Sequence, residues 1–365
     1  MSFGARALIR LGALQHNFRR IREVAHGARV LAVVKANAYG HGLVATAENL
    51  PDADGFAVAH YDEALELFDA GLRKPVVLLE GVLDSEELDG ALYRKFQPVV
   101  HCEQQIELLR RSSASDAVVW LKLDTGMHRL GFAPDLLGAL LARLSGCRAV
   151  REIRVMTHLA NADDRADETT SRQLNVFRRA IREFEGHISV ANSPAVFGWP
   201  DAMTMAGLDA SRTWVRAGIC LYGVSPFPGG CGSELGLQPV MEFTTSLIAV
   251  KPVRAGARVG YGAAWEAAED TVLGVFAAGY GDGYTRFIPA GTPVLVNGRR
   301  ASLAGRVSMD MSAVDLGPGA TDRVGDPVTL WGEALPVEEV ATRAGTIPYQ
   351  LLCGVTQRAR RVCVD

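Results

Sequence analysis

Long apolar runs, paired cysteines and an excess of either charge are all missing from this sequence of 365 residues. No apolar run approaches the roughly 18 residues of a membrane-spanning helix, which argues against a transmembrane protein. The six cysteines form neither a CxxC pair nor a zinc-ligand spacing, so we expect reduced thiols and no metal site. A net charge of −3 gives no electrostatic reason to expect a nucleic-acid or membrane partner.

Lysine is also scarce, which makes each lysine informative. Only five of the 38 basic residues are lysines, and they are Lys35, Lys74, Lys95, Lys122 and Lys251. The composition, 48% hydrophobic and 22% charged, is that of a folded globular chain. The segment 1–14 is interrupted by arginines and lacks the apolar core of a signal peptide, so a cytoplasmic protein is expected.

Short apolar runs alternate with amphipathic stretches over the first 220 or so residues. Eight such runs predict parallel strands separated by helices, and therefore a closed (β/α)₈ barrel over residues 1–230. A doubly wound open sheet is the alternative fold. The predicted strands are Arg29–Val34, Gly55–Ala59, Pro75–Glu80, Phe96–Val100, Ala117–Leu123, Ile153–His158, His187–Asn192 and Trp214–Leu221.

Glycine becomes more frequent and helical periodicity largely stops in the rest of the chain, which predicts a mainly β domain over residues 231–365. The first few residues of the chain could join this second domain instead of the barrel. Its predicted strands are Met241–Val250, Thr271–Ala277, Thr292–Val296, Ala301–Met309 and Pro327–Leu330, and its predicted helix is Val337–Ala344.

Catalytic groups of a barrel lie where its strands end, and the first apolar run ends at Lys35. Partial burial at the barrel mouth lowers the pKa of a lysine and frees its amine to attack carbonyl carbons. A lysine whose ammonium group simply extends from the rim into water is an equally simple interpretation of this feature alone.

The string AVVKANAYGHG at residues 32–42 closely resembles the cofactor-lysine motif of bacterial alanine racemases, and further motifs extend the resemblance over nearly the whole chain. The resemblance implies an isomerase that uses pyridoxal phosphate (PLP) to interconvert L- and D-alanine, for peptidoglycan or for catabolism. It also implies that Lys35 carries the PLP and that Tyr39 contacts its phosphate.

The string LKLDTGMHRLG at residues 121–131 contains Lys122 and Arg129. An arginine offers a fixed fork of donors that suits a carboxylate or a phenolate. By resemblance, Arg129 binds the phenolic oxygen of the cofactor and the carboxylate of the substrate. In many members of the family the lysine of this motif is carbamylated and holds that arginine, so Lys122 is either carbamylated or a buried lysine paired with a carboxylate.

Further polar residues follow the last three predicted barrel strands. Ser193 lies where a helix N-terminus would bind phosphate, and Gly218 permits close backbone approach, although an ordinary N-cap serine is the simpler alternative. By resemblance, the residues that contact the cofactor here are His158, Asn192, Ser193, Arg216, Gly218, Ile219 and, from the second domain, Tyr349.

Arg216 carries the sharpest mechanistic implication. By resemblance it hydrogen-bonds the pyridine nitrogen of the cofactor, and a permanent cation there keeps that nitrogen unprotonated. The ring is then a weaker electron sink, which favours racemisation over decarboxylation or transamination. Related decarboxylases of this fold carry an acidic residue at the same place.

The second domain contributes Tyr261, in the string GYG, and Met309 and Asp310, in the string GRVSMD. Racemisation needs a proton-transfer group on each face of the substrate carbon. By resemblance, Lys35 serves the face from which D-alanine loses its proton and Tyr261 serves the other face. By the same resemblance, the backbone N–H of Met309 binds the carboxylate of the substrate and Asp310 is a nearby polar contact. The family acts as a head-to-tail homodimer, so these three residues would reach the cavity of the partner subunit.

Three other functions are weighed against an alanine racemase. A PLP decarboxylase of the same fold is disfavoured by Arg216, and by Tyr261 where a cysteine would stand. A racemase of broad substrate range is harder to dismiss, since pocket size depends on packing. A non-catalytic PLP carrier would have a lone barrel and no second domain.

Overall fold

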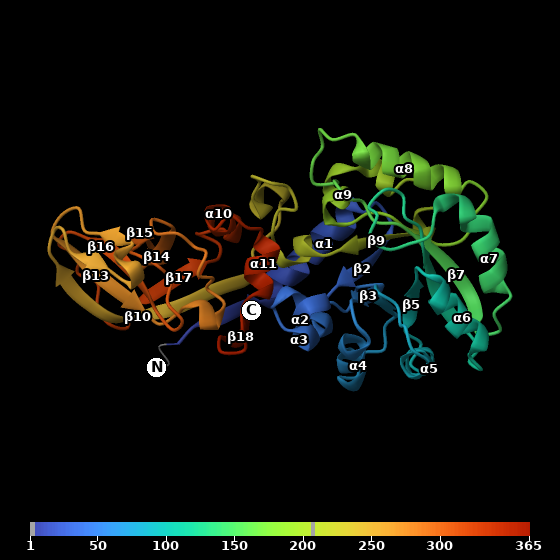
Figure 1. Ribbon diagram of the computed structural model, residues 1–365, viewed down its shortest axis with the longest axis horizontal. Helices are drawn as coiled ribbons and strands as arrows, with labels where there is room; N and C mark the ends of the chain where they lie inside the picture. Colours follow the sequence, from blue (N-terminus) through green and yellow to red (C-terminus); the bar gives the residue numbers. More distant parts are fainter. Residues whose placement is uncertain (1–3, 206–208) are drawn as a thin grey trace.

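A computed structural model describes residues 4–205 and 209–365, and it contains two bodies side by side along its long axis (Figure 1). The first body is a closed barrel of parallel strands in the order β2 to β9, in which β9 pairs with β2. The predicted (β/α)₈ barrel is therefore confirmed, and the open sheet is excluded. Its strands are β2 Arg29–Val33, β3 Gly55–Val58, β4 Val76–Leu78, β5 Gln97–Val100, β6 Ala117–Lys122, β7 Val150–Met156, β8 Ile188–Ser189 and β9 Thr213–Ala217.

Helices enclose the barrel because each presents one apolar stripe to the strands. In α1, for example, the buried residues include Leu14, Phe18 and Ile21, which recur at three- and four-residue spacing. The strands themselves are apolar on both faces, as parallel strands between helices and a barrel interior must be. The helical segments of this body are α1 Leu11–Val24, α2 Lys35–Tyr39, α3 Leu43–Glu48, α4 Tyr61–Asp69, α5 Ser85–Tyr93, α6 Glu103–Arg111, α7 Leu137–Ser145, α8 Thr169–Ala180 and α9 Ser193–Gly198, of which α2 is a left-handed turn over residues 36–39.

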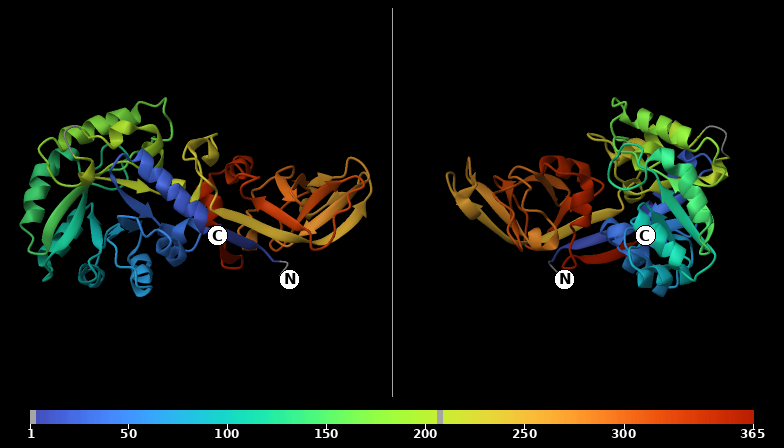
Figure 2. Two further views of the ribbon diagram at one scale, coloured as in Figure 1. Left: turned by 180° about the vertical axis from the view of Figure 1, so that it is seen from behind. Right: turned by 45° about the vertical axis from the view of Figure 1, so that its right-hand side comes forward.

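The second body is built on an eight-stranded sheet in the order β13-β16-β15-β14-β17-β10-β1-β18. Both ends of the chain enter this sheet, since β1 pairs antiparallel with β10 and parallel with β18. Strands β1 and β18 therefore lie side by side, and the C-terminus lies near the junction of the two bodies (Figure 2). Its elements are β1 Arg6–Arg10, β10 Met241–Val253, β11 Arg258–Val259, β12 Trp265–Glu266, β13 Thr271–Phe276, β14 Pro293–Val296, β15 Arg299–Leu303, β16 Ser312–Gly317, β17 Pro327–Trp331, β18 Arg360–Val364, α10 Val337–Arg343 and α11 Pro348–Cys353.

One predicted strand of this domain is wrong in its second half. The strand expected over Ala301–Met309 ends at Leu303, and the chain then runs as an irregular loop to Asp310. Gly305 has a φ of +90°, and a Cβ at this position would lie 3.0 Å from the carbonyl oxygen of Val259. A residue without a side chain permits this turn and ends the ladder.

Among the helices formed by residues 4–205 and 209–365, none combines the length and the apolar character that crossing a bilayer demands.

Two indoles fill the barrel interior toward the N-terminal ends of its strands. Trp214 packs edge to face on Trp120 with ring centroids 5.9 Å apart, and the guanidinium carbons of Arg154 and Arg29 lie 5.0 Å and 5.2 Å from the Trp214 ring. Replacing Trp214 by alanine removes this packing, so we expect the free energy of unfolding to fall by about 3–5 kcal/mol. Denaturant titration measures the change.

Trp214→Phe is the matched control for that variant. The indole Nε1 of Trp214 is buried without a hydrogen-bond partner in the part of the chain that the structure describes, so phenylalanine loses no polar contact there. We expect it to retain most of the stability. An alanine variant as stable as the phenylalanine variant would contradict the assignment of this cluster to the core.

Candidate active site

One cavity of about 1150 Å³ opens at the carboxyl ends of the barrel strands. It brings together predicted site residues from six separate motifs of the sequence. Residues of the second domain, including those of α11, also line it. The predicted site residues that line the cavity are Lys35, Tyr39, Lys122, Arg129, His158, Asn192, Ser193, Arg216, Gly218, Ile219 and Tyr349.

The three remaining predicted site residues do not line this cavity. Tyr261 begins a short 3₁₀ turn of the second domain and is 65% exposed, and Met309 is 51% exposed. The carboxylate of Asp310 pairs with Arg358 at 2.7 Å, and Arg358 also donates to Asp282. Within one chain, therefore, these residues lie outside the cavity, and the side chains of Tyr261 and Met309 are exposed to solvent.

Lys35 leads directly into a left-handed turn. The φ angles of Ala36, Asn37, Ala38 and Tyr39 are all between +52° and +54°. Residues with a Cβ disfavour this conformation by roughly 1–2 kcal/mol each, so a run of four has to be held by its surroundings. Such strain concentrates at functional sites, because only a strongly braced structure tolerates it.

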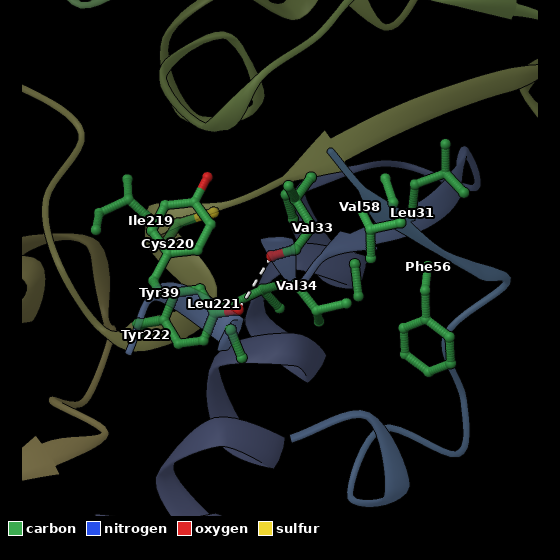
Figure 3. Close-up of a cluster of buried hydrophobic side chains, with 14 of the residues drawn as sticks. Leu31, Val33, Val34, Tyr39, Phe56, Val58, Ile219, Cys220, Leu221 and Tyr222 are labelled. Carbon is green, nitrogen blue, oxygen red and sulfur yellow. Dashed lines mark hydrogen bonds between the residues drawn. The ribbon is translucent and has the colours of Figure 1, made fainter. Parts of the chain in front are cut away.

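Stacked aromatic rings hold the end of this turn (Figure 3). The ring of Tyr39 stacks on that of Tyr222 at 4.9 Å, and Tyr222 donates its hydroxyl hydrogen to the carbonyl oxygen of Val33 at 3.0 Å. Sequence reasoning missed Tyr222, whose only signal is its position just after the last apolar run of the barrel. The ring of Tyr349 lies 5.9 Å from that of Tyr39, so α11 closes the same corner.

Gly218 leaves room at this corner. A Cβ at Gly218 would lie 2.7 Å from Tyr39 Oη and 3.6 Å from Ser193 Oγ. Ser193 Oγ accepts the backbone N–H of Gly218 at 2.9 Å, which fixes the serine against β9. Two hydroxyls thus converge on a space that any residue with a side chain would fill. Hydroxyl groups and backbone N–H groups are common ligands of phosphate oxygens.

The guanidinium of Arg216 is buried and bonded only to neutral groups among the described residues. It donates to Ser189 Oγ at 2.6 Å, to the carbonyl oxygen of Thr157 at 2.7 Å and to that of Val190 at 3.1 Å. Burial lowers the pKa of Arg216 to about 10. The group therefore stays charged at neutral pH and presents a fixed cation beneath the cavity.

His158 is held neutral beside that cation. Its Nδ1 lies 3.1 Å from Arg216 Nη2. Burial, followed by the charge of Arg216, lowers the pKa of His158 well below its ordinary value. A neutral ring that accepts at Nδ1 carries its proton on Nε2, so the imidazole can serve as a donor on its other side.

Lys122 is buried in the same layer without an anionic partner. Burial, followed by the charges of Arg216 and Arg129, lowers its pKa to about 8. No carboxylate within residues 4–205 and 209–365 forms an ion pair with it, although Asp124 lies near enough to raise its pKa slightly. With a pKa of about 8, about a tenth of the amine is uncharged at pH 7.

Lys35 has the same character at the cavity itself. Burial and the charge of Arg129 lower the pKa of its amine, while the carboxylates of Glu80 and Glu63 oppose that shift. A half-buried amine with a lowered pKa is a good nucleophile toward a carbonyl carbon and a good proton acceptor. Together with the nearby cations, it fits an anionic ligand that carries an aldehyde or ketone.

Two family models match the chain, the N-terminal domain of alanine racemases over residues 9–226 and the C-terminal domain of alanine racemases over residues 240–363. The alanine racemase of Shewanella sediminis is 49% identical over 362 residues, with 99% of each chain covered. The biosynthetic alanine racemase of Escherichia coli is 47% identical over 364 residues, again with 99% of each covered.

Solved structures agree with these sequence matches. The crystal structure of the biosynthetic alanine racemase of Pseudomonas aeruginosa superposes with a TM-score of 0.94 at 43% identity, over the whole of both chains. The alanine racemase of Acinetobacter baumannii has a TM-score of 0.91 at 34% identity, also over both whole chains. The chain therefore belongs to the alanine racemase family, whose members are PLP-dependent isomerases.

Proposed function

We propose that this protein interconverts L-alanine and D-alanine with PLP held in the barrel cavity. The observation that carries the proposal is Lys35, a half-buried amine of lowered pKa at the end of β2, in a cavity lined by cations. When bound, PLP supplies an aldehyde that combines with amines and a ring that withdraws electrons from the Cα of the amino acid.

The donor set of the cavity suits this cofactor. Tyr39 Oη, Ser193 Oγ and the open space at Gly218 would take the phosphate, with Asn192, Ile219 and Tyr349 closing the same end. Arg129 would bind the phenolic oxygen and the carboxylate of the substrate. Arg216 would donate to the ring nitrogen, since its Nε hydrogen has no acceptor among the described residues.

Two groups would move the proton at the substrate Cα. Lys35 would accept it from D-alanine, and Tyr261 of the partner subunit would accept it from L-alanine. A tyrosine hydroxyl has an ordinary pKa near 10, so it needs a neighbouring donor to hold the deprotonated form. The Nε2–H of His158, itself fixed by Arg216, supports that role.

A head-to-tail homodimer would bring Tyr261, Met309 and Asp310 to the cavity of the other subunit. The support for this arrangement is their exposure outside the cavity of their own chain. Large apolar side chains gather in the same domain, where Phe287 is 80% exposed and Met311 is 44% exposed. Large apolar side chains that are exposed close together commonly mark a surface that another protein covers.

A biosynthetic role is proposed because two of the most similar proteins, from Escherichia coli and Pseudomonas aeruginosa, are described as biosynthetic alanine racemases. D-alanine made by this chain would then supply peptidoglycan. A racemase of broad substrate range is the second candidate, since the cavity of a single chain is far larger than alanine requires.

Chiral analysis of a small amino-acid panel tests the proposal. The PLP-loaded protein is incubated separately with L-alanine, L-serine and L-lysine, and the D-isomers are quantified. If D-alanine forms much faster than D-serine and D-lysine, the result supports a racemase that is selective for alanine. Equal rates for all three would establish the broad-range racemase, and amine products without D-isomers would establish a decarboxylase.

Carbamylation of Lys122 is a separate prediction. The uncharged amine would take up carbon dioxide to form an N–C bond and release one proton, and the resulting anion would hold Arg129. We expect a carbamate signal in ¹³C NMR after addition of labelled bicarbonate. Lys122→Ala should abolish that signal and lower racemisation by about tenfold or more, the worth of one charge-assisted hydrogen bond.

Lys74→Ala is the control, because Lys74 donates to the carbonyl oxygen of Ala53 on the outside of the barrel. It should leave both the signal and the activity unchanged. An unmodified Lys122 amine at full occupancy in gently handled protein would contradict the predicted carbamylation.

A further inference from the structure

A single carboxylate joins the ends of two neighbouring barrel strands beside Lys35. Glu63, on the first turn of α4, accepts the backbone N–H of Ala36 at 2.6 Å with one oxygen. With the other oxygen it accepts the N–H of Ala59 at 2.8 Å and that of His60 at 3.2 Å. Ala36 follows β2, and Ala59 follows β3, so the carboxylate bridges the two strands where the cavity opens.

Helix capping explains only one of these three contacts. Glu63 is the third residue of α4, and a glutamate there commonly accepts the N–H of the N-cap residue, here His60. The bond to Ala36 spans 27 residues of sequence and lies outside any capping pattern. This long-range contact therefore calls for another explanation.

The contact fixes the start of the left-handed turn. Ala36 is the first residue of that turn and comes directly after Lys35. The far end of the turn has its own braces, because Asn37 Oδ1 accepts the N–H of Leu43 at 2.8 Å and Arg361 Nε donates to the carbonyl oxygen of Gly40 at 2.7 Å. Glu63 is the brace at the lysine end.

We propose that Glu63 is a positioning residue for Lys35, whose carboxylate ties the peptide after the lysine to the neighbouring strand and holds the strained turn in place. This inference rests on the proposed racemase function of the cavity. Release of the Ala36 N–H would let the turn relax toward ordinary backbone angles, because the other hydrogen bond of Ala36 among the described residues, from the N–H of Gly40 to its carbonyl oxygen at 3.0 Å, lies within the same turn. Lys35 and Tyr39, which stand at the two ends of the turn, would then lose their common orientation.

The charge of Glu63 has a second, separable effect. It raises the pKa of Lys35 against the opposing effects of burial and Arg129. Glu63→Gln removes the charge and also one of the two acceptor oxygens. Glu63→Asp keeps the charge but is one methylene shorter, so it cannot span both strand ends. The two variants thus separate reach from charge.

Glu87→Gln is the matched control. Glu87 is also the third residue of its helix, α5, and is also half-buried. Its carboxylate accepts no hydrogen bond from the residues that the structure describes. A fall in kcat or in protection from exchange that both glutamine variants share is therefore a general effect of substitution in the first helical turn.

The experiment combines hydrogen exchange with kinetics on the full-length protein. We expect amide exchange in the peptide over residues 35–43 to speed up by about tenfold in Glu63→Gln and Glu63→Asp, the worth of one hydrogen bond to a carboxylate, and to be unchanged in Glu87→Gln. The kcat for PLP-loaded protein should fall by about tenfold, while KM for alanine changes by less than about twofold.

The pH profile distinguishes the two variants. Loss of the negative charge lowers the pKa of Lys35, so the acidic limb of D-alanine turnover should move to lower pH in Glu63→Gln and stay near the wild-type position in Glu63→Asp. A glutamine variant that matches Glu87→Gln in exchange and in kcat would overturn the proposal. So would faster exchange confined to α4, which indicates capping alone.

Failure of the proposed function is recognised separately. Wild-type protein that forms no D-alanine would refute the racemase, whereas the exchange comparison needs neither substrate nor cofactor. If the Lys35 segment exchanges no faster in either Glu63 variant, the positioning role is wrong whatever reaction the cavity performs.

Discussion

Replacing Lys35 by alanine is expected to abolish alanine racemisation, with a fall in kcat of at least about a thousandfold. The amine has two tasks in the proposed reaction, to hold PLP covalently and to exchange a proton with the substrate Cα. Loss of a positioned acid–base group alone typically costs 10²- to 10⁴-fold, and loss of the nucleophile adds to that. Lys122 also lines the cavity, but its side chain is buried, so we do not expect it to substitute for Lys35.

Borohydride reduction followed by peptide mapping checks this assignment. The reductant should fix PLP on the peptide that contains Lys35 in wild-type protein and label no peptide in Lys35→Ala. Lys74→Ala, on the outside of the barrel, should be labelled and active like the wild type. Label on the peptide of Lys122 would show that the cofactor lysine has been misassigned.

Tyr261→Phe is expected to lower racemisation by about 10²- to 10⁴-fold in both directions, since it removes one of two proton-transfer groups. Proton exchange without racemisation should survive on one face only. In heavy water, Lys35 of the variant can still remove the α-proton of D-alanine and return a deuteron to the same face. D-Alanine should therefore gain deuterium, whereas L-alanine should not.

Mixing two inactive proteins tests whether Tyr261 acts across subunits. A dimer that pairs Lys35→Ala with Tyr261→Ala would contain one cavity with both wild-type groups and one with neither. Random subunit exchange makes half of the dimers mixed, so about a quarter of the wild-type sites should return. Recovery requires contributions from two chains. No recovery, with subunit exchange demonstrated by mass spectrometry, would rule out the shared site.

The barrel could be predicted because its signals are local and repeated. Each parallel strand is buried on both faces, so each appears as a short apolar run, and the helices between them show their own periodicity. Six of the eight predicted runs enclose a barrel strand, and the other two, Ile153–His158 and Trp214–Leu221, overlap β7 and β9, which begin earlier. The ends of these apolar runs therefore also predicted where the strands end, which is where the candidate residues lie.

The left-handed turn after Lys35 could not be predicted. Ala36, Asn37 and Ala38 are not glycines, and alanine is the strongest helix former, so local propensity favours a right-handed helix here. The turn depends on contacts from remote elements, namely Glu63 of α4, Tyr222 after β9 and Arg361 of β18. The local sequence of residues 32–42 carries no signal for contacts with such distant residues.

The second domain was predicted less well for a related reason. Its sheet is assembled from both ends of the chain, and the terminal strands β1 and β18 carried too weak a signal to be identified. β16 was not predicted because its last residue, Gly317, belongs to the glycine-rich segment up to Gly319, whose composition is typical of a turn. The site residues Tyr261 and Met309 lie on irregular segments, where composition says little about placement.

The position of deuterium in the products of one reaction tests the two-group racemase most directly. PLP-loaded wild-type protein is incubated briefly with L-alanine in heavy water. The two enantiomers are then separated, and the deuterium content of each is measured by mass spectrometry. We predict D-alanine that carries deuterium at Cα and recovered L-alanine that is still largely unlabelled, because separate groups remove and deliver the proton. D-Alanine that retains the original proton would contradict a mechanism with two proton-transfer groups. An absence of D-alanine would contradict the racemase activity itself.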